Sequence, residues 1–245
     1  MMDCCEFLEW DSAFFGFPVA RLRSHLLNAE LGERCLQWCL RHGIRCLYFL
    51  AACDDIETTD TAARFGFRLV DIRMTLEHDL RGARRSSSHV RPCRETDMEM
   101  LKAIAAHSHR DSRFYHDTHF PRERCDELYA TWIERSFRGY ADAVLVAERD
   151  GRPAGYVTCH LNPAGVGSIG LLGVAAEARG QGVGGELVEA ALAHFREHGM
   201  TRATVVTQGR NVAAQRLYQR HGFLTRSVQF WYHKWFGLPE ADSAV

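Results

Sequence analysis

Along the first third of the chain, some segments have the apolar pattern of strands and others the three-to-four-residue apolar spacing of helices, as is typical of a mixed α/β unit. The elements expected there are strands near 5–9 and 17–23, a helix near 30–42, a buried strand at 45–52, a short helix ending before Gly66 and a strand at 68–79. Asn28 can cap the first long helix with its side-chain oxygen, and Gly43 can end it. The pattern therefore predicts a small α/β unit before residue 80.

The remaining two thirds of the chain also show the patterns of strands and helices, and they contain more of these elements. The elements expected there are a strand at 90–94, a helix at 95–106 started by Thr96, a polar loop at 107–121, a helix at 122–137 stopped by Gly139, strands at 143–149, 154–162 and 168–175, a helix at 183–198, a strand at 203–207, a helix at 211–221 and a final strand pair around 223–235. Asp150-Gly151 and Pro163-Ala164-Gly165 are typical hairpin turns, so the three central strands are expected to be antiparallel.

Residues 81–94 interrupt the pattern with five arginines, three serines and no acidic residue. Such a stretch is typical of a linker. We therefore expect a small α/β N-terminal domain at 1–80, a linker at 81–89, a larger domain at 90–237 and a tail at 238–245. A basic arm for nucleic acid is the alternative, but neither interleaved aromatic residues nor a nucleic-acid-binding motif accompanies the arginines.

Composition narrows the class of protein. The 245 residues are 46% hydrophobic, which is enough for a folded core, and the net charge of −1 gives no global field that would attract nucleic acid or a membrane. No apolar run approaches the ~18 residues of a membrane-spanning helix. The acidic N-terminus lacks the basic start and apolar core of a signal peptide. We therefore expect a cytoplasmic protein with no nucleic-acid or membrane partner.

Nine cysteines and two histidine pairs raise the question of disulfides or a metal site. The number of cysteines is odd and no C-x-x-C spacing occurs, so we expect free thiols that pack as small apolar residues. His107 with His109, and His116 with His119, offer a zinc alternative. Neither pair is accompanied by a strong pattern of Cys or carboxylate partners, and no metal is expected.

The segment Arg179-Gly180-Gln181-Gly182-Val183-Gly184 follows a β-rich run and opens an amphipathic helix. Its glycines let the backbone approach a ligand closely, and the helix start directs free N–H groups and a positive dipole end at that point. A dinucleotide-binding fold would place its glycines in the first βαβ unit, and a P-loop would end in Gly-Lys-Ser/Thr. Neither pattern is present, so the segment predicts an anion site suited to a pyrophosphate.

A second motif runs from Asn211 to Phe223. On a helix, Asn211, Ala214 or Gln215, and Tyr218 share one face. Asn211 stands at the helix start, where its side chain can cap the helix or contact a ligand, and Tyr218 places a phenol further along the same face. Gly222 after this helix permits a left-handed stop.

The two motifs in this order resemble those of the GNAT superfamily of acyl-CoA N-acyltransferases. R-G-x-G-x-G opens one helix and N-x-x-A-x-x-x-Y-x-x-x-G-F occupies the next, and the resemblance covers roughly residues 90–235. It implies an α+β GNAT fold, in which helices flank a central mixed, mostly antiparallel sheet, preceded here by a smaller truncated GNAT-like α/β domain. It also implies acetyl-CoA as co-substrate, with no metal.

The resemblance assigns a set of residues to acyl-CoA. They are Leu172, Gly173, Val174, Arg179, Gly180, Gln181, Gly182, Val183, Gly184, Asn211, Ala214 and Tyr218. The amides of 180–184, helped by Arg179, would bind the pyrophosphate, and strand 172–174 would pair with the pantetheine arm and polarise the thioester carbonyl. Tyr218 would be the general acid that protonates the departing thiolate. From the residues alone, a structural turn, a core strand, a simple helix cap and a buried aromatic remain the alternatives.

Three further segments are similar to GNAT enzymes that acetylate the 4-amino group of a dTDP-4-amino-4,6-dideoxygalactose. They are LEWDSAFFG at 8–16, DSRF at 111–114 and IGLL at 169–172. This resemblance implies direct transfer in a ternary complex to a nucleotide-linked amino sugar, and a homodimer. Phe15, Arg113 and His116 are candidates for substrate binding, with core packing or a solvated surface position as their alternatives. Asp71 is the candidate base, or else a structural carboxylate.

Two other functions remain open. One is a GNAT N-acetyltransferase for another amine, such as an antibiotic, a polyamine or a protein N-terminus. The other is a non-catalytic module that binds acyl-CoA, against which the presence of Tyr218 argues.

Overall fold

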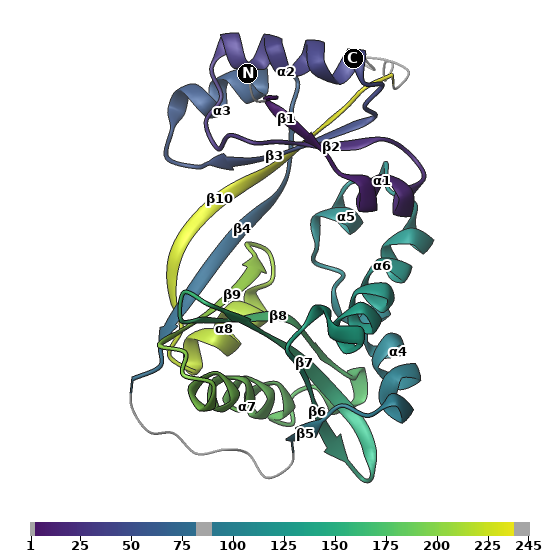
Figure 1. The fold of residues 1–245 in the computed structure, drawn as a ribbon, viewed down its shortest axis with the longest axis vertical. Helices are drawn as coiled ribbons and strands as arrows, with labels where there is room; N and C mark the ends of the chain where they lie inside the picture. Colours follow the sequence, from purple (N-terminus) through teal and green to yellow (C-terminus); the bar gives the residue numbers. More distant parts are fainter. Residues whose placement is uncertain (1–2, 82–89, 238–245) are drawn as a thin grey trace. The chain divides into compact units, whose positions relative to one another are not determined.

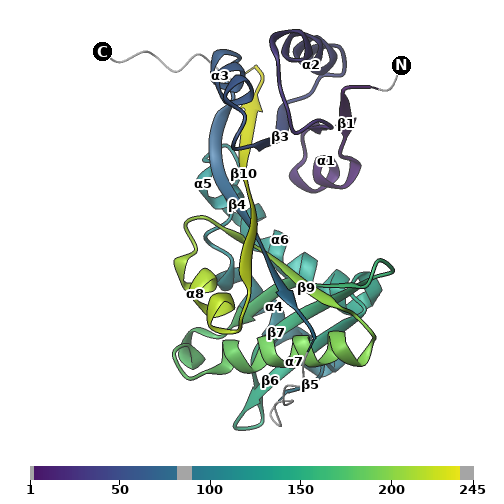
Figure 2. The same ribbon diagram turned by 90° about the vertical axis from the view of Figure 1, so that its left-hand side faces the viewer.

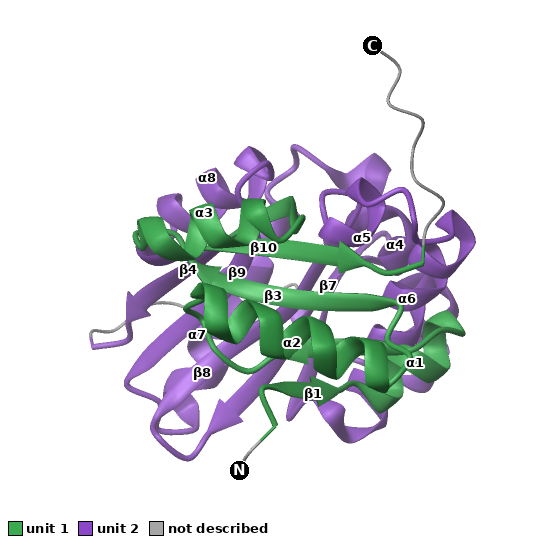
Figure 3. Cartoon of the chain, turned by 90° about the horizontal axis from the view of Figure 1, so that it is seen from above, with its two compact units in different colours: residues 1–73, 228–245 green, residues 74–227 purple. Residues whose placement is uncertain are grey.

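The computed structural model describes residues 3–81 and 90–237 (Figure 1). The chain forms two compact units, one made of residues 1–73 and 228–245 and the other of residues 74–227 (Figure 3). We call them unit 1 and unit 2. Among the described residues, no helix combines the length and the apolar character needed to cross a membrane.

This division differs from the predicted boundary at 81–89. Strands β4 (Arg68–Asp79) and β10 (Leu224–Trp235) each have residues in both units. The end of β10 belongs to unit 1 because it pairs antiparallel with β3 (Cys46–Ala52), with Phe230 opposite Ala51. The predicted strand pair around 223–235 is therefore wrong, since one 12-residue strand takes its place. Residues 82–89 of the predicted linker and the predicted tail lie outside the described residues, so both remain predictions.

Unit 1 is a small α/β arrangement, as the sequence predicted. Its elements are β1 (Cys5–Phe7), α1 (Glu9–Phe15), β2 (Val19–Leu22), α2 (Ala29–Arg41), β3, α3 (Ile56–Arg64), the first residues of β4 and the last of β10. β1 pairs antiparallel with β2, and β2 pairs parallel with β3. The predicted cap is confirmed, because Asn28 accepts the Leu31 N–H at 2.9 Å.

Helix α1 was not predicted from the sequence. It has only seven residues and ends at Gly16, which adopts a left-handed conformation (φ +79°) and donates its N–H to the Ser12 carbonyl. Aromatic packing accompanies it: the rings of Trp10 and Phe14 stack with centroids 5.0 Å apart. A helix this short has too few residues for a clear 3.6-residue period.

Unit 2 contains the larger sheet. Its elements are β5 (Val90–Pro92), η1 (Glu95–Asp97), α4 (Met98–Ser108), α5 (Arg113–His116), α6 (Arg122–Arg135), η2 (Ser136–Tyr140), β6 (Ala143–Arg149), β7 (Arg152–Asn162), β8 (Val166–Val174), η3 (Ala176–Ala178), α7 (Val183–Glu197), β9 (Arg202–Gln208), α8 (Val212–Arg220), the last residues of β4 and the first of β10. The strand order β9-β8-β7-β6-β5 is antiparallel except for the parallel β8–β9 pair. The predicted mixed, mostly antiparallel sheet is confirmed.

Helices cover both faces of this sheet (Figure 2). A Cβ on Gly155 would lie 3.0 Å from Leu187 of α7, whereas the hydroxyl of the next residue, Tyr156, meets His109 just after α4. Neighbouring strand residues point to opposite faces, so α7 covers one face and the end of α4 lies on the other.

Two details of unit 2 depart from the sequence expectations. The helix predicted from Thr96 begins instead with the 3₁₀ turn η1, because the Asp97 carboxylate turns back to accept the Arg94 N–H at 2.8 Å. The predicted polar loop at 107–121 contains the short helix α5.

Candidate functional site

A cleft of about 660 Å³ opens in unit 2 beside the end of β8. It is lined by His107, Ser108, Arg110, Asp111, Leu172, Val174, Ala178, Arg179, Gly180, Gly182, Val183, Gly184, Gly185, Asn211, Ala213, Ala214, Leu217 and Arg220. The structure thus brings together the glycine segment, the strand before it and the Asn211 helix, which are separate in the sequence. Most of the residues that the sequence assigned to acyl-CoA lie in this one cleft.

The glycine segment presents a row of amides at the start of α7. Gly180 and Gly182 adopt left-handed conformations, with φ of +76° and +85°. The amides of Gly185 and Glu186 donate to the Gly182 carbonyl at 2.9 and 3.1 Å. No backbone hydrogen bond between described residues uses the amides of 180–184. These amides and the positive end of the α7 dipole can therefore bind an anion.

The end of β8 has an open edge. Its pairing with β9 stops at Ile169 opposite Val205, whereas its pairing with β7 continues to Val174 opposite Gly155. The Leu171 N–H donates to the Thr158 hydroxyl, on the β7 side of the strand. The last residues of β8 are thus paired on one side only.

Alternation along β8 decides which groups face this open edge. The Leu171 N–H and, at 2.9 Å, the Ala175 N–H donate toward β7. Because successive peptide groups of a strand point to opposite sides, the N–H and C=O groups of Leu172 and Val174 face away from β7. An extended ligand can add to them as a further strand would.

Gly173 and Gln181, which the sequence also assigned to acyl-CoA, are not among the residues that line the cleft. A Cβ on Gly173 would lie 2.7 Å from the Tyr156 ring, so this glycine makes room for Tyr156 on β7. The Gln181 side chain donates to the Glu177 carbonyl at 2.8 Å and lines a neighbouring hollow. Cofactor contact by these two residues remains a prediction.

Three arginines give the cleft a positive lining. Arg179 was expected there, but Arg110 and Arg220 were not. Helical spacing offered a signal for Arg220, because Ala213, Leu217 and Arg220 follow the i, i+4, i+7 pattern of one helix face. Arg110 had no such signal, since it lies in the turn after α4.

Asn211 is both a helix cap and a cleft residue. Its side-chain oxygen accepts the Ala214 N–H at 3.0 Å, which fixes the start of α8. Two glycines let α8 approach α7 closely: a Cβ on Gly184 would lie 3.2 Å from Leu217, and one on Gly185 would lie 2.9 Å from His221. Glycine is therefore needed at the start of α7 for helix packing as well as for the cleft.

Tyr218 is buried rather than among the residues that line the cleft. Its exposed fraction is 5%, and its ring contacts Phe223 edge-on with centroids 5.7 Å apart. Burial raises the pKa of its phenol, so the hydroxyl stays protonated near neutral pH. A general acid must hold this proton before the reaction.

The remaining predicted residues do not line the cleft. Phe15 and Asp71 belong to unit 1: Phe15 is buried against Phe14 and Phe17, and the buried Asp71 carboxylate accepts the N–H of its neighbour Ile72. Their substrate and base roles remain predictions.

Arg113 and His116 lie in unit 2, on α5. The Arg113 guanidinium lies 4.3 Å from the centre of the Phe114 ring. His116 is exposed, and partial burial together with the nearby charge of Arg210 lowers the pKa of its imidazole. Substrate contact by this helix is likewise a prediction.

The left-handed glycines on either side of α7 allow a matched pair of substitutions. Gly182 and Gly199 have φ of +85° and +74°, and an added Cβ meets no described atom within 4 Å at either position. Each alanine substitution should cost about 1–2 kcal/mol of stability, because alanine resists the left-handed region. Only Gly182→Ala should also weaken binding of the acetyl-CoA that the sequence resemblance implies, by about tenfold in Kd. Calorimetry on both variants tests this, and equal affinities would contradict it.

His109 makes stability depend on pH. Its Nε2 lies 3.0 Å from the Tyr156 hydroxyl, its ring stacks on Tyr129, and burial lowers the pKa of the imidazole to about 4. The unfolded chain, with a His pKa of about 6.5, binds the proton first as pH falls. The stabilising effect is therefore complete above pH 6.5 and lost toward pH 4. Because of His109, we expect the free energy of unfolding to fall by roughly 1–2 kcal/mol between pH 7 and pH 5.

Urea unfolding at both pH values checks this expectation. His109→Gln should show a shallower pH dependence than the native chain, whereas the exposed neighbour His107→Gln should keep the native dependence. The same slope in all three proteins would exclude His109 as the source.

Comparison with known proteins gives matches in both sequence and fold. Residues 102–223 match the acetyltransferase (GNAT) family. The chain is 29% identical over 235 residues to the dTDP-fucosamine acetyltransferase of Escherichia coli O6:H1, covering 94% of this chain and 97% of that protein. It is 28% identical over 141 residues to the spore coat polysaccharide biosynthesis protein SpsD of Bacillus subtilis, covering 58% and 48% of the two chains.

Solved structures resemble most of the chain in fold. A GCN5-related N-acetyltransferase from Sphaerobacter thermophilus matches with a TM-score of 0.66 and 15% identity, over 94% of this chain and 76% of that one. One from Kribbella flavida matches with a TM-score of 0.65 and 15% identity, over 97% and 89%. At this identity, the likeness concerns the fold.

Proposed function

The chain carries an acetyltransferase domain of the GNAT family and is an acyltransferase, and from that premise we propose that it acetylates the amino group of a nucleotide-linked amino-dideoxy sugar. The observation that carries the acyl-CoA half of this proposal is the open edge of β8 beside the amides of 180–184. The acceptor half rests on similarity, over nearly the full length of both chains, to an enzyme named for dTDP-fucosamine.

The cleft suits the two chemically different parts of acetyl-CoA. The amides of 180–184, with the nearby Arg110, Arg179 and Arg220, offer N–H donors and positive charge to the phosphates. The N–H groups of Leu172 and Val174 and the C=O of Leu172 can hydrogen-bond the amide-containing pantetheine arm, whereas the Val174 C=O already accepts the Arg179 Nε–H at 3.4 Å. Acetyl-CoA, when bound, supplies an acyl group already activated as a thioester.

Residues of the chain then have separate tasks in transfer. An amide at the open edge of β8, from Leu172 or Val174, donates a hydrogen bond to the carbonyl oxygen as negative charge develops there. The Tyr218 phenol gives its proton to the departing sulfur. The amine attacks directly while both substrates are bound, so no acyl-enzyme is needed.

The attacking amine must be neutral, and a base has to accept a proton as the C–N bond forms. Asp71 is our candidate for this base, with Phe15, Arg113 and His116 as candidate contacts for the sugar nucleotide. Asp71→Asn should lower kcat and flatten the acidic limb of the pH–rate profile. A profile that keeps its acidic limb would assign the base to another group.

A substrate panel tests the proposed function. The purified full chain is incubated with acetyl-CoA and dTDP-linked 4-amino and 3-amino sugars, an aminoglycoside, a polyamine and a peptide with a free N-terminus. CoA release and the acetylated product are measured. We expect turnover of a dTDP-linked 4-amino-4,6-dideoxyhexose. Turnover confined to the other amines would overturn the sugar assignment, and binding of acetyl-CoA without turnover of any member would favour a non-catalytic binding module.

A further inference from the structure

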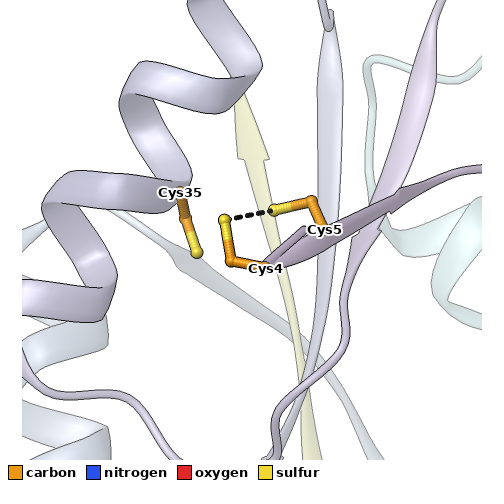
Figure 4. Close-up of side chains that lie close together, drawn as sticks. All are labelled: Cys4, Cys5 and Cys35. Carbon is orange, nitrogen blue, oxygen red and sulfur yellow. Dashed lines mark hydrogen bonds between the residues drawn. The ribbon is translucent and has the colours of Figure 1, made fainter. Parts of the chain in front are cut away.

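Three cysteine thiols meet in unit 1, where no residue of the proposed acyl-transfer cleft lies. Cys4 and Cys5 stand at the start of β1, and Cys35 projects toward them from α2 (Figure 4). The three Sγ atoms all lie within 4.8 Å of one another, and those of Cys4 and Cys5 are 3.9 Å apart. All three are free thiols, and a fourth, the buried Cys39, contacts Cys5 from the next turn of α2.

The spacing of the Cys4 and Cys5 sulfurs is that of two ligands around a metal ion. With metal–sulfur bonds of about 2.3 Å, neighbouring sulfurs are about 3.8 Å apart in a tetrahedral site and about 4.0 Å in a trigonal one. The Cys4–Cys5 separation of 3.9 Å agrees with both. A disulfide would instead need sulfurs about 2.05 Å apart. The three side chains could therefore hold one ion after small movements.

The surroundings of the cluster give it access to solvent and a nearby positive charge. Cys4 is partly exposed and lines a cavity of about 300 Å³ together with Arg34, Glu33 and Trp38. The hydrogen bond with Cys5 and burial raise the pKa of the Cys35 thiol, while Arg34 acts in the opposite direction. A metal would bind as the three thiols lose their protons.

We propose that Cys4, Cys5 and Cys35 form a binding site for a thiophilic metal ion, Zn²⁺ or Cu⁺. A ligand set made of sulfur alone selects such ions over Mg²⁺ or Ca²⁺, which prefer oxygen. Each metal–sulfur bond replaces an S–H bond, the protons pass to water, and no electron is transferred. The bound ion links β1 to α2 and stabilises unit 1.

Metal titration of the reduced full-length protein under anaerobic conditions tests this site. Zn²⁺ and Cu⁺ are added separately in competition with a chromophoric chelator, and Co²⁺ serves as a spectroscopic stand-in for Zn²⁺. We expect one ion per chain, a thiolate-to-cobalt charge-transfer band, and a rise in thermal midpoint on addition of the bound ion. Cys35→Ala and Cys4→Ser should each weaken binding at least about tenfold.

A second cluster variant and one control variant outside the cluster make the result decisive. Cys4→Ser changes a partly exposed residue and keeps the proposal testable if Cys35→Ala does not fold. Cys53→Ser, a partly buried cysteine of unit 1 outside the cluster, should bind as the native chain does. Absence of binding by the native chain, equal loss in Cys53→Ser, or native-like binding by Cys4→Ser would each overturn the site. None of these outcomes bears on acetyl transfer, so this proposal and the proposed function fail independently.

Discussion

Tyr218→Phe is expected to lower kcat by about 10²–10³-fold while leaving the Kd of acetyl-CoA nearly unchanged. The substitution removes only the hydroxyl, and burial keeps that hydroxyl protonated near neutral pH. The Tyr218 ring, which packs against Phe223, remains in place, so the helix that lines the cleft should be preserved. The thiolate then has to depart without a positioned proton donor.

Steady-state kinetics and calorimetry together check this prediction. Tyr232→Phe is the matched control, because Tyr232 is also buried but lies in the part of β10 that belongs to unit 1. Its kcat should stay close to the native value. If Tyr218→Phe left kcat unchanged and product formed in a burst, release would be the slow step. An unchanged kcat without a burst would assign the acid to another group.

Asp97→Asn is expected to destabilise the chain by about 2–3 kcal/mol. The Asp97 carboxylate is 5% exposed and accepts two hydrogen bonds from Arg91, at 2.7 and 3.0 Å, as well as the Arg94 N–H. Arg91 also binds Glu148 on β6 at 2.8 Å, so the pair ties η1 to the sheet. The amide would leave a largely buried guanidinium without its main anion.

Urea unfolding of Asp97→Asn measures this effect, with Glu95→Gln as control. The Glu95–Arg138 pair is more than half exposed on both sides, and its loss should cost at most about 0.5 kcal/mol. The hydrogen bond from Arg91 lowers the pKa of Asp97, so the unfolded chain takes up the proton first. The stabilisation is therefore complete above about pH 4 and lost as pH falls through the folded pKa. Equal losses in the two variants would contradict this account.

Local signals in the sequence were sufficient where one segment determines its own structure. Asn28 caps α2 because its side chain reaches an amide three residues away. The strands at 68–79 and 143–149 have the predicted bounds. Asp150-Gly151 turns β6 into β7 as expected, with left-handed backbone at both residues. Each of these features depends on neighbours in the chain.

The sequence did not predict features that depend on contacts between segments far apart in the chain. Around 223–235 it predicted two strands, but β10 is continuous because its last residues pair with β3, which lies far away in the chain. The seven residues of α1 gave too short a period to detect. Arg110 reaches the cleft only because the end of α4 comes to lie beside α7 and α8.

By itself, the sequence determined the order of most elements and the family of the chain, because the glycine segment and the Asn211 helix carry their chemistry in fixed spacings. Only the tertiary structure showed that these two segments line one cleft together with an open edge of β8. That edge exists because β9 stops pairing with β8 at Ile169, and the pairing of two strands cannot be read from either strand alone. It alone also brought Cys35 to Cys4 and Cys5. No spacing in the chain predicts that meeting, because it depends on how α2 packs over β1.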